Sequence, residues 1–439
     1  MNRLDTKKRS DSLRASFFDG VFASGMTGLT QDYFTPFLLL LGGGVREVGL
    51  LSSLPNIVGS LAQLATFDIM RRLKSRKKTI TVFVFLQALA LLCIAVMAYA
   101  GAASLALCIA LVTVFTALGA VATPAWGSLM SDLVPEGKRG AYFGWRNSVL
   151  GVVIVAFSLS AGSILHSMEG DAVRMGFFAI FGLAFAFRLG SWYNLKKMYD
   201  PDVRHAPAPA VRVKAFLGAL KGSNFARFLL FISLMSFTVN LAAPYFAVLM
   251  LKDLGFGYFK YTIVTITATF MMYALMNRWG RFSDAIGNLR VLKFTAPIIA
   301  IIPLLWIVSR NPLFLVFAQI VSGFAWAGFN LCATNYIYDA VAPEKRVRYI
   351  SYFNVLNGLS LSAGALAGGL LVAYLPPLMG YKILTLFAVS SALRLIVCAA
   401  VPFSLREVRS VQSVNSRDLF FSMIGFRPLL GVDRKTIRY

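Results

Sequence analysis

The chain has 439 residues, of which 58% are hydrophobic and only 14% are charged, against about 25% charged residues in ordinary soluble domains. Its 43 Lys and Arg residues outnumber its 19 Asp and Glu residues, which gives a formal net charge of +24. This composition excludes an ordinary soluble domain, and without a folded basic domain it argues against nucleic-acid binding. The four cysteines have no paired spacing, so neither a disulfide framework nor a metal site is expected.

Long apolar runs follow one another through the first half of the chain. Each is close to the roughly 20 residues that cross a bilayer as a helix, and none alternates apolar with polar residues as a membrane barrel strand does. We therefore expect six membrane-spanning helices here, near residues 17–41, 49–67, 79–100, 105–130, 141–166 and 175–193.

The second half repeats this organisation after a polar segment that contains Ala206-Pro207-Ala208-Pro209. Six further spans are expected near residues 228–251, 261–279, 291–308, 312–338, 349–374 and 383–402. The predicted fold is an all-α membrane protein with twelve transmembrane helices in two pseudo-symmetric six-helix bundles. Its predicted parts are bundles at 1–195 and 224–404, a cytoplasmic linker at 196–223 with an amphipathic stretch near 213–220, and a basic tail at 405–439.

An internal repeat supports two related halves. Residues 132, 134, 138, 139, 142, 147, 151 and 162 are found again 207 positions later, beginning with Asp132 and Asp339 and ending with Gly162 and Gly369. A repeat of nearly half the length in an apolar chain is typical of a duplicated membrane unit, as in many transporters.

Basic residues fix the expected orientation. If the amino terminus is cytoplasmic, most of the 43 Lys and Arg residues fall in cytoplasmic segments, as the positive-inside rule requires. We expect a multi-pass, monomeric protein of the cell (inner) membrane with both termini in the cytoplasm. The basic first residues then precede a retained first span and not a cleaved signal.

The segment from Gly280 to Arg290, between the eighth and ninth spans, has Gly280, Asp284, Gly287 and Arg290 at the spacing G-x-x-x-D-x-x-G-x-x-R. It resembles the loop signature of the major facilitator superfamily. The copy expected between the second and third spans is altered, with Arg71 in place of an acid and Lys74 in place of glycine. The resemblance implies two six-helix bundles around a central cavity lined mainly by spans one, four, seven and ten.

A cytoplasmic gate is the expected role of these loops. An acid can bond to exposed helix amino-terminal donors, and a neighbouring arginine can bridge to the other bundle. The expected gate residues are Asp132, Arg139, Arg146, Gly280, Asp284, Gly287, Arg290, Asp339 and Arg346. Arg146 is expected to join a network with Asp132, and the alternative is that it points deeper into the membrane and reaches an anionic ligand. The alternative is that all of them only fix loop geometry and topology.

Polar groups inside the spans are candidates for substrate or proton binding, since they seldom face lipid. Asp32, beside Gln31, is the first of them, and aligning Pro36 with Pro244 sets it opposite Asn240. A carboxyl group removed from water takes up a proton more readily, which would couple transport to a proton gradient. The alternative is a structural acid bonded to a neighbouring helix or to external solvent.

Three other charged residues are expected to have simpler roles. Asp19 lies close to the cytoplasmic interface on nearly the opposite helix face from Asp32, so simple solvation is favoured. Arg188 and Arg394 repeat in similar contexts late in spans six and twelve. Both are expected to extend their side chains toward the cytoplasm, and the alternative is contact with a substrate.

The cavity lining is expected to be aromatic with a few amides. The candidates are Trp126 on span four and Trp326, Asn330 and Tyr336 on span ten. Such faces would suit a moderately apolar or amphipathic solute. The alternative for any one of these aromatic residues is ordinary helix packing.

The sequence therefore predicts a secondary active transporter of a small organic solute, coupled to protons and working by alternating access. No enzymatic activity and no cofactor are expected, and Gly42-Gly43-Gly44 lacks the Lys-Ser or Lys-Thr of a phosphate loop. Two alternatives stay open, an uncoupled facilitator and a transporter-like membrane sensor or assembly factor whose basic tail would hold the partner surface.

Overall fold

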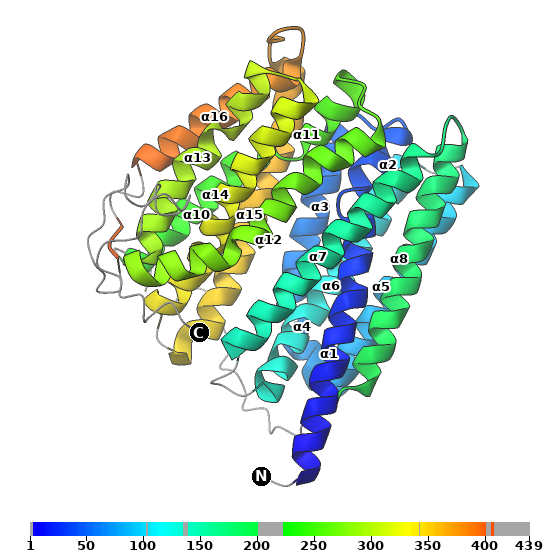
Figure 1. Ribbon diagram of the computed structural model, residues 1–439, viewed down its shortest axis with the longest axis vertical. Helices are drawn as coiled ribbons and strands as arrows, with labels where there is room; N and C mark the ends of the chain where they lie inside the picture. Colours follow the sequence, from blue (N-terminus) through cyan, green and yellow to red (C-terminus); the bar gives the residue numbers. More distant parts are fainter. Residues whose placement is uncertain are drawn as a thin grey trace. The chain divides into compact units, whose positions relative to one another are not determined.

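The computed structural model describes residues 3–101, 104–134, 139–200, 223–341, 343–400 and 405–407. All regular secondary structure within these ranges is helical (Figure 1), which confirms the predicted all-α fold. The amphipathic stretch near 213–220 and the tail from residue 408 onward lie outside the described residues.

The described residues of the first half form eight helices, because two of its predicted spans are broken. Their bounds are α1 Arg3–Thr30, α2 Phe34–Leu40, α3 Val45–Leu64, α4 Thr66–Leu73, α5 Arg76–Ala100, α6 Leu105–Leu133, α7 Arg139–His166 and α8 Ala172–Lys197.

The second half follows the same plan. Its helices are α10 Asn224–Asn240, α11 Tyr245–Val248, the short π-helix η2 Leu249–Asp253, α12 Tyr258–Ile286, α13 Asn288–Val308, α14 Pro312–Ala340, α15 Pro343–Tyr374 and α16 Lys382–Ala400.

Corresponding spans are broken at corresponding places in the two halves. The predicted first span, 17–41, is interrupted by a turn at residues 31–33, and the predicted seventh, 228–251, by a turn at residues 241–244. A proline follows each interruption closely, Pro36 in α2 and Pro244 at the N-cap of α11; proline starts a helix well but cannot continue one.

The count of twelve spans is confirmed only in part. Among the described residues, ten helices are long and apolar enough to cross a membrane. An eleventh span is formed if α3 and α4 are joined, although they bend by 48°. The remaining predicted span, the pair α1 and α2, is not among these helices; α1 has 28 residues, but its amino-terminal part is polar and basic.

The signature segment is largely helical and not a loop. Gly280 and Asp284 both lie inside α12, and Gly287 alone separates α12 from α13. Gly287 can make this turn because its φ is +94°, a left-handed value that costs glycine little. In the altered copy Lys74, at the end of α4, also has a positive φ of +53°, but its ψ of 20° differs from the 150° of Gly287.

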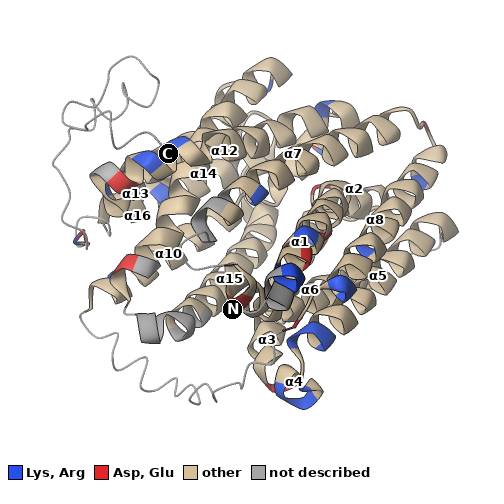
Figure 2. Cartoon of the chain, turned by 60° about the horizontal axis from the view of Figure 1, so that its bottom comes forward, with Lys and Arg blue, Asp and Glu red and all other residues tan. Residues whose placement is uncertain are grey.

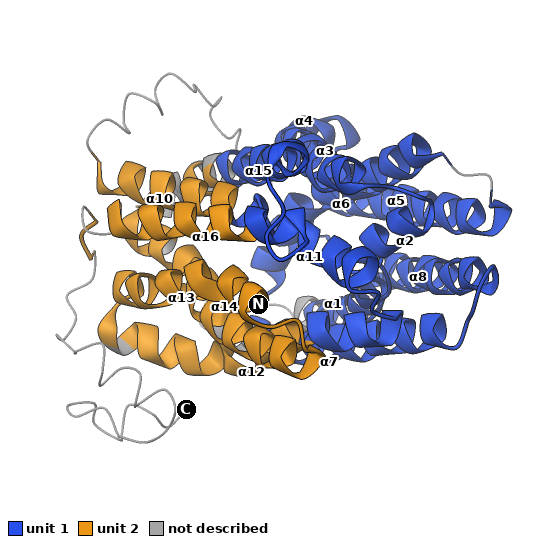
Figure 3. Ribbon diagram, turned by 90° about the horizontal axis from the view of Figure 1, so that it is seen from above, with its two compact units in different colours: residues 1–209, 239–266, 354–386 blue, residues 210–238, 267–353, 387–439 orange. Residues whose placement is uncertain are grey.

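The described chain forms two compact units (Figure 3). Unit 1 comprises residues 1–209, 239–266 and 354–386, and unit 2 comprises residues 210–238, 267–353 and 387–439. Unit 1 thus combines the first half with α11, η2 and parts of α10, α12, α15 and α16. The predicted domain boundaries follow the sequence repeat, which is a different criterion, so they stay a prediction.

Within unit 1, α5 packs against α6 and α8, α1 packs against α7 and α8, and α3 packs against α6. An apolar cluster from α1, α5, α6 and α8 includes Ala15, Ile80 and Leu129. Near the chain's amino terminus, Lys and Arg residues gather on α1 and α4 (Figure 2). We call this end of the helices of unit 1 proximal, and the opposite end, with α2, distal.

Candidate functional site

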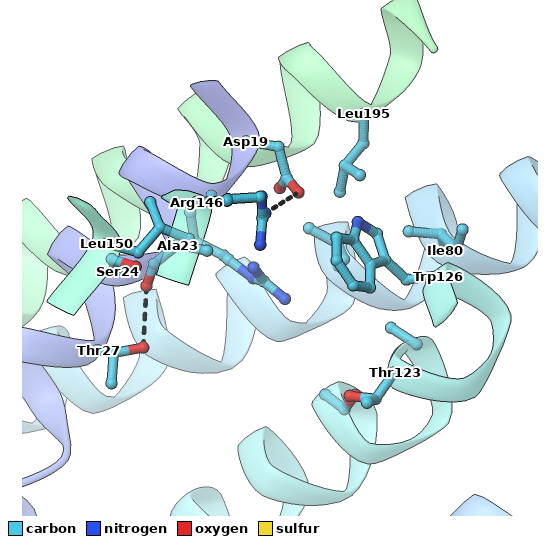
Figure 4. Close-up of a pocket in the computed structure, with 15 residues that line it drawn as sticks. Asp19, Ala23, Ser24, Thr27, Ile80, Thr123, Trp126, Arg146, Leu150 and Leu195 are labelled. Atoms are coloured by element: carbon cyan, nitrogen blue, oxygen red, sulfur yellow. Dashed lines mark hydrogen bonds and ion pairs between the residues drawn. The ribbon is translucent and has the colours of Figure 1, made fainter. Parts of the chain in front are cut away.

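A cavity of about 250 Å³ lies within unit 1 (Figure 4). Five helices line it, namely α1, α5, α6, α7 and α8. The lining residues are Asp19, Gly20, Ala23, Ser24, Thr27, Ile80, Val84, Gly119, Ala122, Thr123, Trp126, Arg146, Leu150, Arg188 and Leu195. Most of the lining residues are apolar, and the charged ones are Asp19, Arg146 and Arg188.

Asp19 of α1 is buried, with 5% of its surface exposed, and is not solvated as the sequence suggested. Its Oδ1 accepts a hydrogen bond of 2.7 Å from Ser191 Oγ of α8. Its Oδ2 lies 3.9 Å from Arg146 Nη2 of α7. The prediction of a solvated Asp19 was wrong because both partners are far away along the chain, and no sequence pattern near Asp19 indicates them.

Arg146 crosses the cavity wall beside Asp19. Its guanidinium lies over the Trp126 ring, 4.9 Å from the ring centroid, and Nη2 donates to the carbonyl of Ser16 at 3.1 Å. The absence of a side chain at Gly20 makes room for it, since a methyl group there would lie 2.8 Å from Arg146 Cζ and from Leu150 Cδ1. The expected pairing of Arg146 with Asp132 is not what the structure shows.

Arg188 of α8 also lines this cavity and does not extend into the cytoplasm as expected. Its Nη1 donates to Ser191 Oγ at 3.1 Å, and Ser191 in turn donates to Asp19. Asp19 is therefore linked to both arginines, to Arg146 by an ion pair and to Arg188 through a hydroxyl group.

Three nitrogen donors at this site are buried without a hydrogen-bond acceptor: Arg146 Nε, Arg188 Nε and Trp126 Nε1. The Trp126 indole is turned toward Asp19 but makes no hydrogen bond. A buried donor without a partner is costly, so three of them around one cavity indicate a place where an acceptor can bind.

The remaining polar groups of the cavity are satisfied within their own helices. Thr27 Oγ1 donates to the carbonyl of Ala23 at 2.9 Å, and Thr123 Oγ1 donates to that of Gly119 at 3.0 Å. Both hydroxyl oxygens keep lone pairs that can accept a further hydrogen bond. The part of the cavity near the two arginines therefore has unused hydrogen-bond donors, while the part near Thr27 and Thr123 has hydroxyl oxygens that can accept.

A second polar cluster occupies the proximal end of unit 1. Arg76, the first residue of α5, has a side chain that is only 3% exposed and lies between two acids. Its Nη1 is 2.5 Å from Asp132 Oδ2 and its Nη2 is 3.1 Å from Asp200 Oδ1. Asp200 also accepts from the backbone amide of Lys77, and Arg9 donates to the carbonyl of Asp132.

Unit 2 contains the corresponding cluster, built from the repeat. Asn288, the first residue of α13, donates to Asp339 Oδ2 at 2.6 Å. The next backbone amide, of Leu289, donates to Glu407 Oε2 at 2.8 Å. Asp339 and Glu407 stand 207 positions after Asp132 and Asp200, respectively, so the acids are kept. The first residue of the corresponding helix is the uncharged Asn288 in place of Arg76.

The other expected gate residues do not belong to these two clusters. Asp284 is exposed, and Arg290 donates to the carbonyl of Ile286 at 3.4 Å. The side chains of Arg139 and Arg346, in the first turns of α7 and α15, lie outside the described residues. A gate formed by the whole set stays a prediction.

The expected coupling residues lie at the distal end of unit 1. Gln31 and Asp32 are in the turn between α1 and α2, and Asn240 is the last residue of α10, before the matching turn. Asp32 is half-buried, and its backbone carbonyl accepts from Tyr261 Oη at 2.7 Å. Its carboxylate has no ion pair with any cation in the described part of the chain.

Distal contacts within unit 1 join helices from the two halves of the sequence. The hydroxyl of Tyr33, before α2, lies 2.5 Å from the carbonyl of Ser158 and 2.8 Å from Thr262 Oγ1 of α12. Lys252 Nζ donates to the carbonyl of Gly43 at 2.7 Å.

Small residues form the seam between α3 and α15. Ser362 Oγ donates to the carbonyl of Ser53 at 3.1 Å. A methyl group added at Gly49 would lie 2.7 Å from Tyr245 Oη and 3.1 Å from the carbonyl of Ala365. The two helices therefore approach closely through small residues, and the Tyr245 hydroxyl lies beside Gly49 and Gly369 and donates to the carbonyl of Ala365.

The expected lining residues of span ten are dispersed along α14 in unit 2. Trp326 packs edge-on against Phe329 at 5.6 Å, and Asn330 is exposed with Nδ2 3.6 Å from Met272 Sδ. Tyr336 is fully buried, stacks on Phe228 and accepts a hydrogen bond of 2.7 Å from Asn224. Of the four expected lining residues, Trp126 is the one that reaches the described cavity.

Comparison with known proteins gives a consistent result. The sequence pattern of the family described as Major Facilitator Superfamily matches residues 20–309 and 278–432. No curated protein sequence matches the chain.

Three solved structures illustrate the shared fold. A mutant of the nucleoside transporter NupG has a TM-score of 0.69 and 13% identity, over 91% of this chain and 100% of that one. A bacterial homologue of the human lysosomal transporter Spinster, inward-facing and unoccupied, has 0.66 and 14%, over 90% and 97%. The human organic anion transporter MFSD10 (TETRAN) has 0.59 and 14%, over 91% and 99%.

Proposed function

The chain belongs to the major facilitator superfamily, and on that premise we propose that it is a proton-coupled secondary transporter of a small organic solute. Membership makes it a multi-pass membrane transporter. The structural neighbours carry different solutes by name, nucleosides in one case and organic anions in another, so the shared fold does not select a substrate.

One observation supports proton coupling. The buried carboxylate of Asp19 is linked to Arg146 and Arg188 at the wall of the unit 1 cavity. A carboxylate without its charge attracts a guanidinium far less strongly. Protonation of Asp19 would therefore weaken its attraction for both guanidinium groups, and deprotonation would restore that attraction.

The groups that face Asp19 come from each helix packed against α1. They are Arg146 on α7, with Tyr142 one turn earlier, Arg188 with Ser191 on α8, and Trp126 on α6. Asp19 is the one acid among them, so a change of its charge is the event to which the two cations respond.

The clusters at the helix ends fit a transport cycle. We assign the seam between α3 and α15 and the Tyr33 contacts to an external gate in its closed state. The clusters around Arg76 and Asn288 are assigned to the cytoplasmic gate, with both termini in the cytoplasm of a cell whose inner membrane holds the protein. Alternating access then requires each gate to open while the other is closed.

Solute-dependent proton flux tests the proposal. The purified full chain is reconstituted in vesicles containing a pH-sensitive dye, and a panel of small organic solutes is applied with and without a pH gradient. We expect one or more solutes to acidify the lumen when both solute and gradient point inward. Asp19→Asn should abolish gradient-driven accumulation and leave solute exchange without a gradient intact.

Asp32→Asn is the matched control in the same helix pair. If Asp19→Asn keeps gradient-driven accumulation while Asp32→Asn loses it, the proton site is at Asp32. If neither variant changes the dependence on the gradient, the proton site is at neither acid and the assignment to Asp19 fails. If no gradient drives wild-type transport, the protein is an uncoupled facilitator and the proposal of proton coupling fails.

A further inference from the structure

We infer that the solute is an organic anion whose carboxylate or phosphate group binds Arg146 and Arg188 in the unit 1 cavity, in place of the Asp19 carboxylate. The inference deepens the proposed function and rests on it for the claim that a solute enters this cavity. It does not rest on proton coupling, and the two can be tested separately.

Charge balance is the first argument. Two guanidinium groups, of Arg146 and Arg188, face one carboxylate, of Asp19, so the site carries a formal charge of +2 − 1 = +1. No other acid lines the cavity. An isolated charge in an apolar wall is costly unless it is paired, so a ligand with one negative charge would make the site neutral.

The unused donors are the second argument. Arg146 is 94% buried, since only 6% of its surface is exposed, yet its Nε has no hydrogen-bond acceptor. The buried Arg188 Nε and Trp126 Nε1 also have no acceptor. A guanidinium presents donors in a planar fork that matches the two oxygens of a carboxylate or phosphate. A neutral solute could accept from these donors through a carbonyl or hydroxyl oxygen, but it would leave the positive charge of the site unbalanced.

The size and shape of the wall set the rest of the ligand. A volume of about 250 Å³ is below the roughly 300–1,000 Å³ of drug-sized pockets. Away from the arginines the wall is formed by Ile80, Val84 and Leu150, with the hydroxyls of Thr27 and Thr123. The fitting ligand is small, with one anionic end and a mainly apolar body.

Competition with Asp19 follows from the geometry. Because the ligand and Asp19 need the same guanidinium groups, protonating Asp19 should strengthen anion binding. Proton and anion would then bind together and travel in the same direction. Replacing Asp19 by asparagine should mimic the protonated state permanently.

Binding to the purified full chain in detergent tests this without any gradient. The probes are phenylacetate, phenyl phosphate and the uncharged phenylacetamide, with affinity measured calorimetrically at pH 5.5 and 7.5. We expect at least one of the two anions, and not the amide, to bind wild-type protein, more tightly at the lower pH. The preferred anion distinguishes a carboxylate from a phosphate ligand.

Variants locate the site. Asp19→Asn should bind the preferred anion about tenfold more tightly at pH 7.5, with little pH dependence, while Arg146→Gln should lose about tenfold or more, as for a charge-assisted hydrogen bond. If Arg146→Gln fails to fold with Asp19 unpaired, the double variant Asp19→Asn/Arg146→Gln removes both charges and should still bind weakly. Arg394→Gln, a buried arginine in unit 2, is the control and should bind like wild type.

Three results would overturn the inference: equal binding of amide and anions, anion binding unaffected in the double variant, or unchanged affinity in Asp19→Asn. Anion binding that follows the expected pattern in a protein whose flux ignores the pH gradient would support the inference and refute proton coupling. If a pH gradient drives transport of neutral solutes only, proton coupling is supported and the inference of an anionic solute is refuted.

Discussion

Arg188 in unit 1 and Arg394 in unit 2 occupy related positions in the two halves of the sequence, but their surroundings differ. Arg188 reaches Asp19 through Ser191 at the wall of a cavity. Arg394 is 3% exposed and donates to the backbone carbonyl of Ile299 at 3.0 Å. One arginine belongs to a charged network, while the other caps a helix carbonyl in a packed interior.

The rest of the charged site has no counterpart in the second half. The positions 207 residues after Asp19, Trp126 and Arg146 hold Ala226, Ala333 and Phe353. In contrast, the acids of the helix-end clusters are kept in both halves. The repeat therefore keeps the acids of the helix-end clusters and not the charged groups at the cavity wall. Under the proposal of an anionic solute, recognition of its charge would belong to the first half.

The largest expected effect concerns the helix-end clusters. Arg76→Ala leaves Asp132 and Asp200 without their shared cation, which should destabilise the protein by roughly 3 kcal/mol or more. Asn288→Ala removes an uncharged donor in the corresponding cluster and should cost about 1–2 kcal/mol. Thermal unfolding of the two purified variants measures the difference, and equal losses would show that the charge of Arg76 does not matter.

The next effect separates the two related arginines. Arg188→Gln should weaken binding of the anionic solute by about tenfold or more, since a charge-assisted contact is lost. Arg394→Gln should lower the melting temperature and leave solute affinity unchanged. A loss of affinity in Arg394→Gln as large as that in Arg188→Gln would refute the assignment of charge recognition to the first half.

A smaller effect is expected at Gly20, where an added methyl group would displace the Arg146 guanidinium. Gly20→Ala should reduce transport roughly tenfold, because misplacing a binding group by about 1 Å is costly. In Gly182→Ala, on α8, the added methyl would meet no atom within 4 Å, so initial uptake rates should match wild type. Normal rates in Gly20→Ala would mean that Arg146 can move without consequence.

The smallest effect concerns the two turns that open α5 and α13. Lys74 has the left-handed φ that Gly287 adopts in the other half, and this costs a non-glycine residue about 1–2 kcal/mol. Lys74→Gly should relieve part of that cost and stabilise the protein by about 1 kcal/mol or less, since glycine loses more entropy on folding. Gly287→Ala should destabilise the protein, because alanine avoids a positive φ. A loss of stability in Lys74→Gly, or a gain in Gly287→Ala, in thermal unfolding would contradict this account of the two turns.

Much of the fold could be predicted from the sequence because long apolar segments have few alternative structures in a membrane. The ends of α5, α6, α7 and α13 lie within a few residues of the expected spans. The breaks after Thr30 and Asn240 were not expected, although Pro36 and Pro244 mark both. The helical course of Gly280 to Ile286 was also missed, because a polar segment looks the same in a loop and in a helix end.

The candidate site was predicted less well, for a physical reason. Asp19 and Ser191 are separated by 172 positions, and helix packing alone brings them together. Trp126 was found because tryptophan on span four was expected to face a cavity. The partner of Asp132 was missed because Arg76 lies in the altered signature, whereas Glu407 could have been found, since it repeats Asp200 at the same shift as the other pairs.

The seam between α3 and α15 has a consequence for leakage. Gly49, Ser53, Ser362 and Ala365 have no long side chains whose rotamers could open a narrow passage for water while the helices stay in place. A file of water molecules across this barrier would need the two backbones to separate as rigid bodies. Ion permeability should therefore stay very low between turnovers, and the membrane potential should be protected even when the protein is abundant.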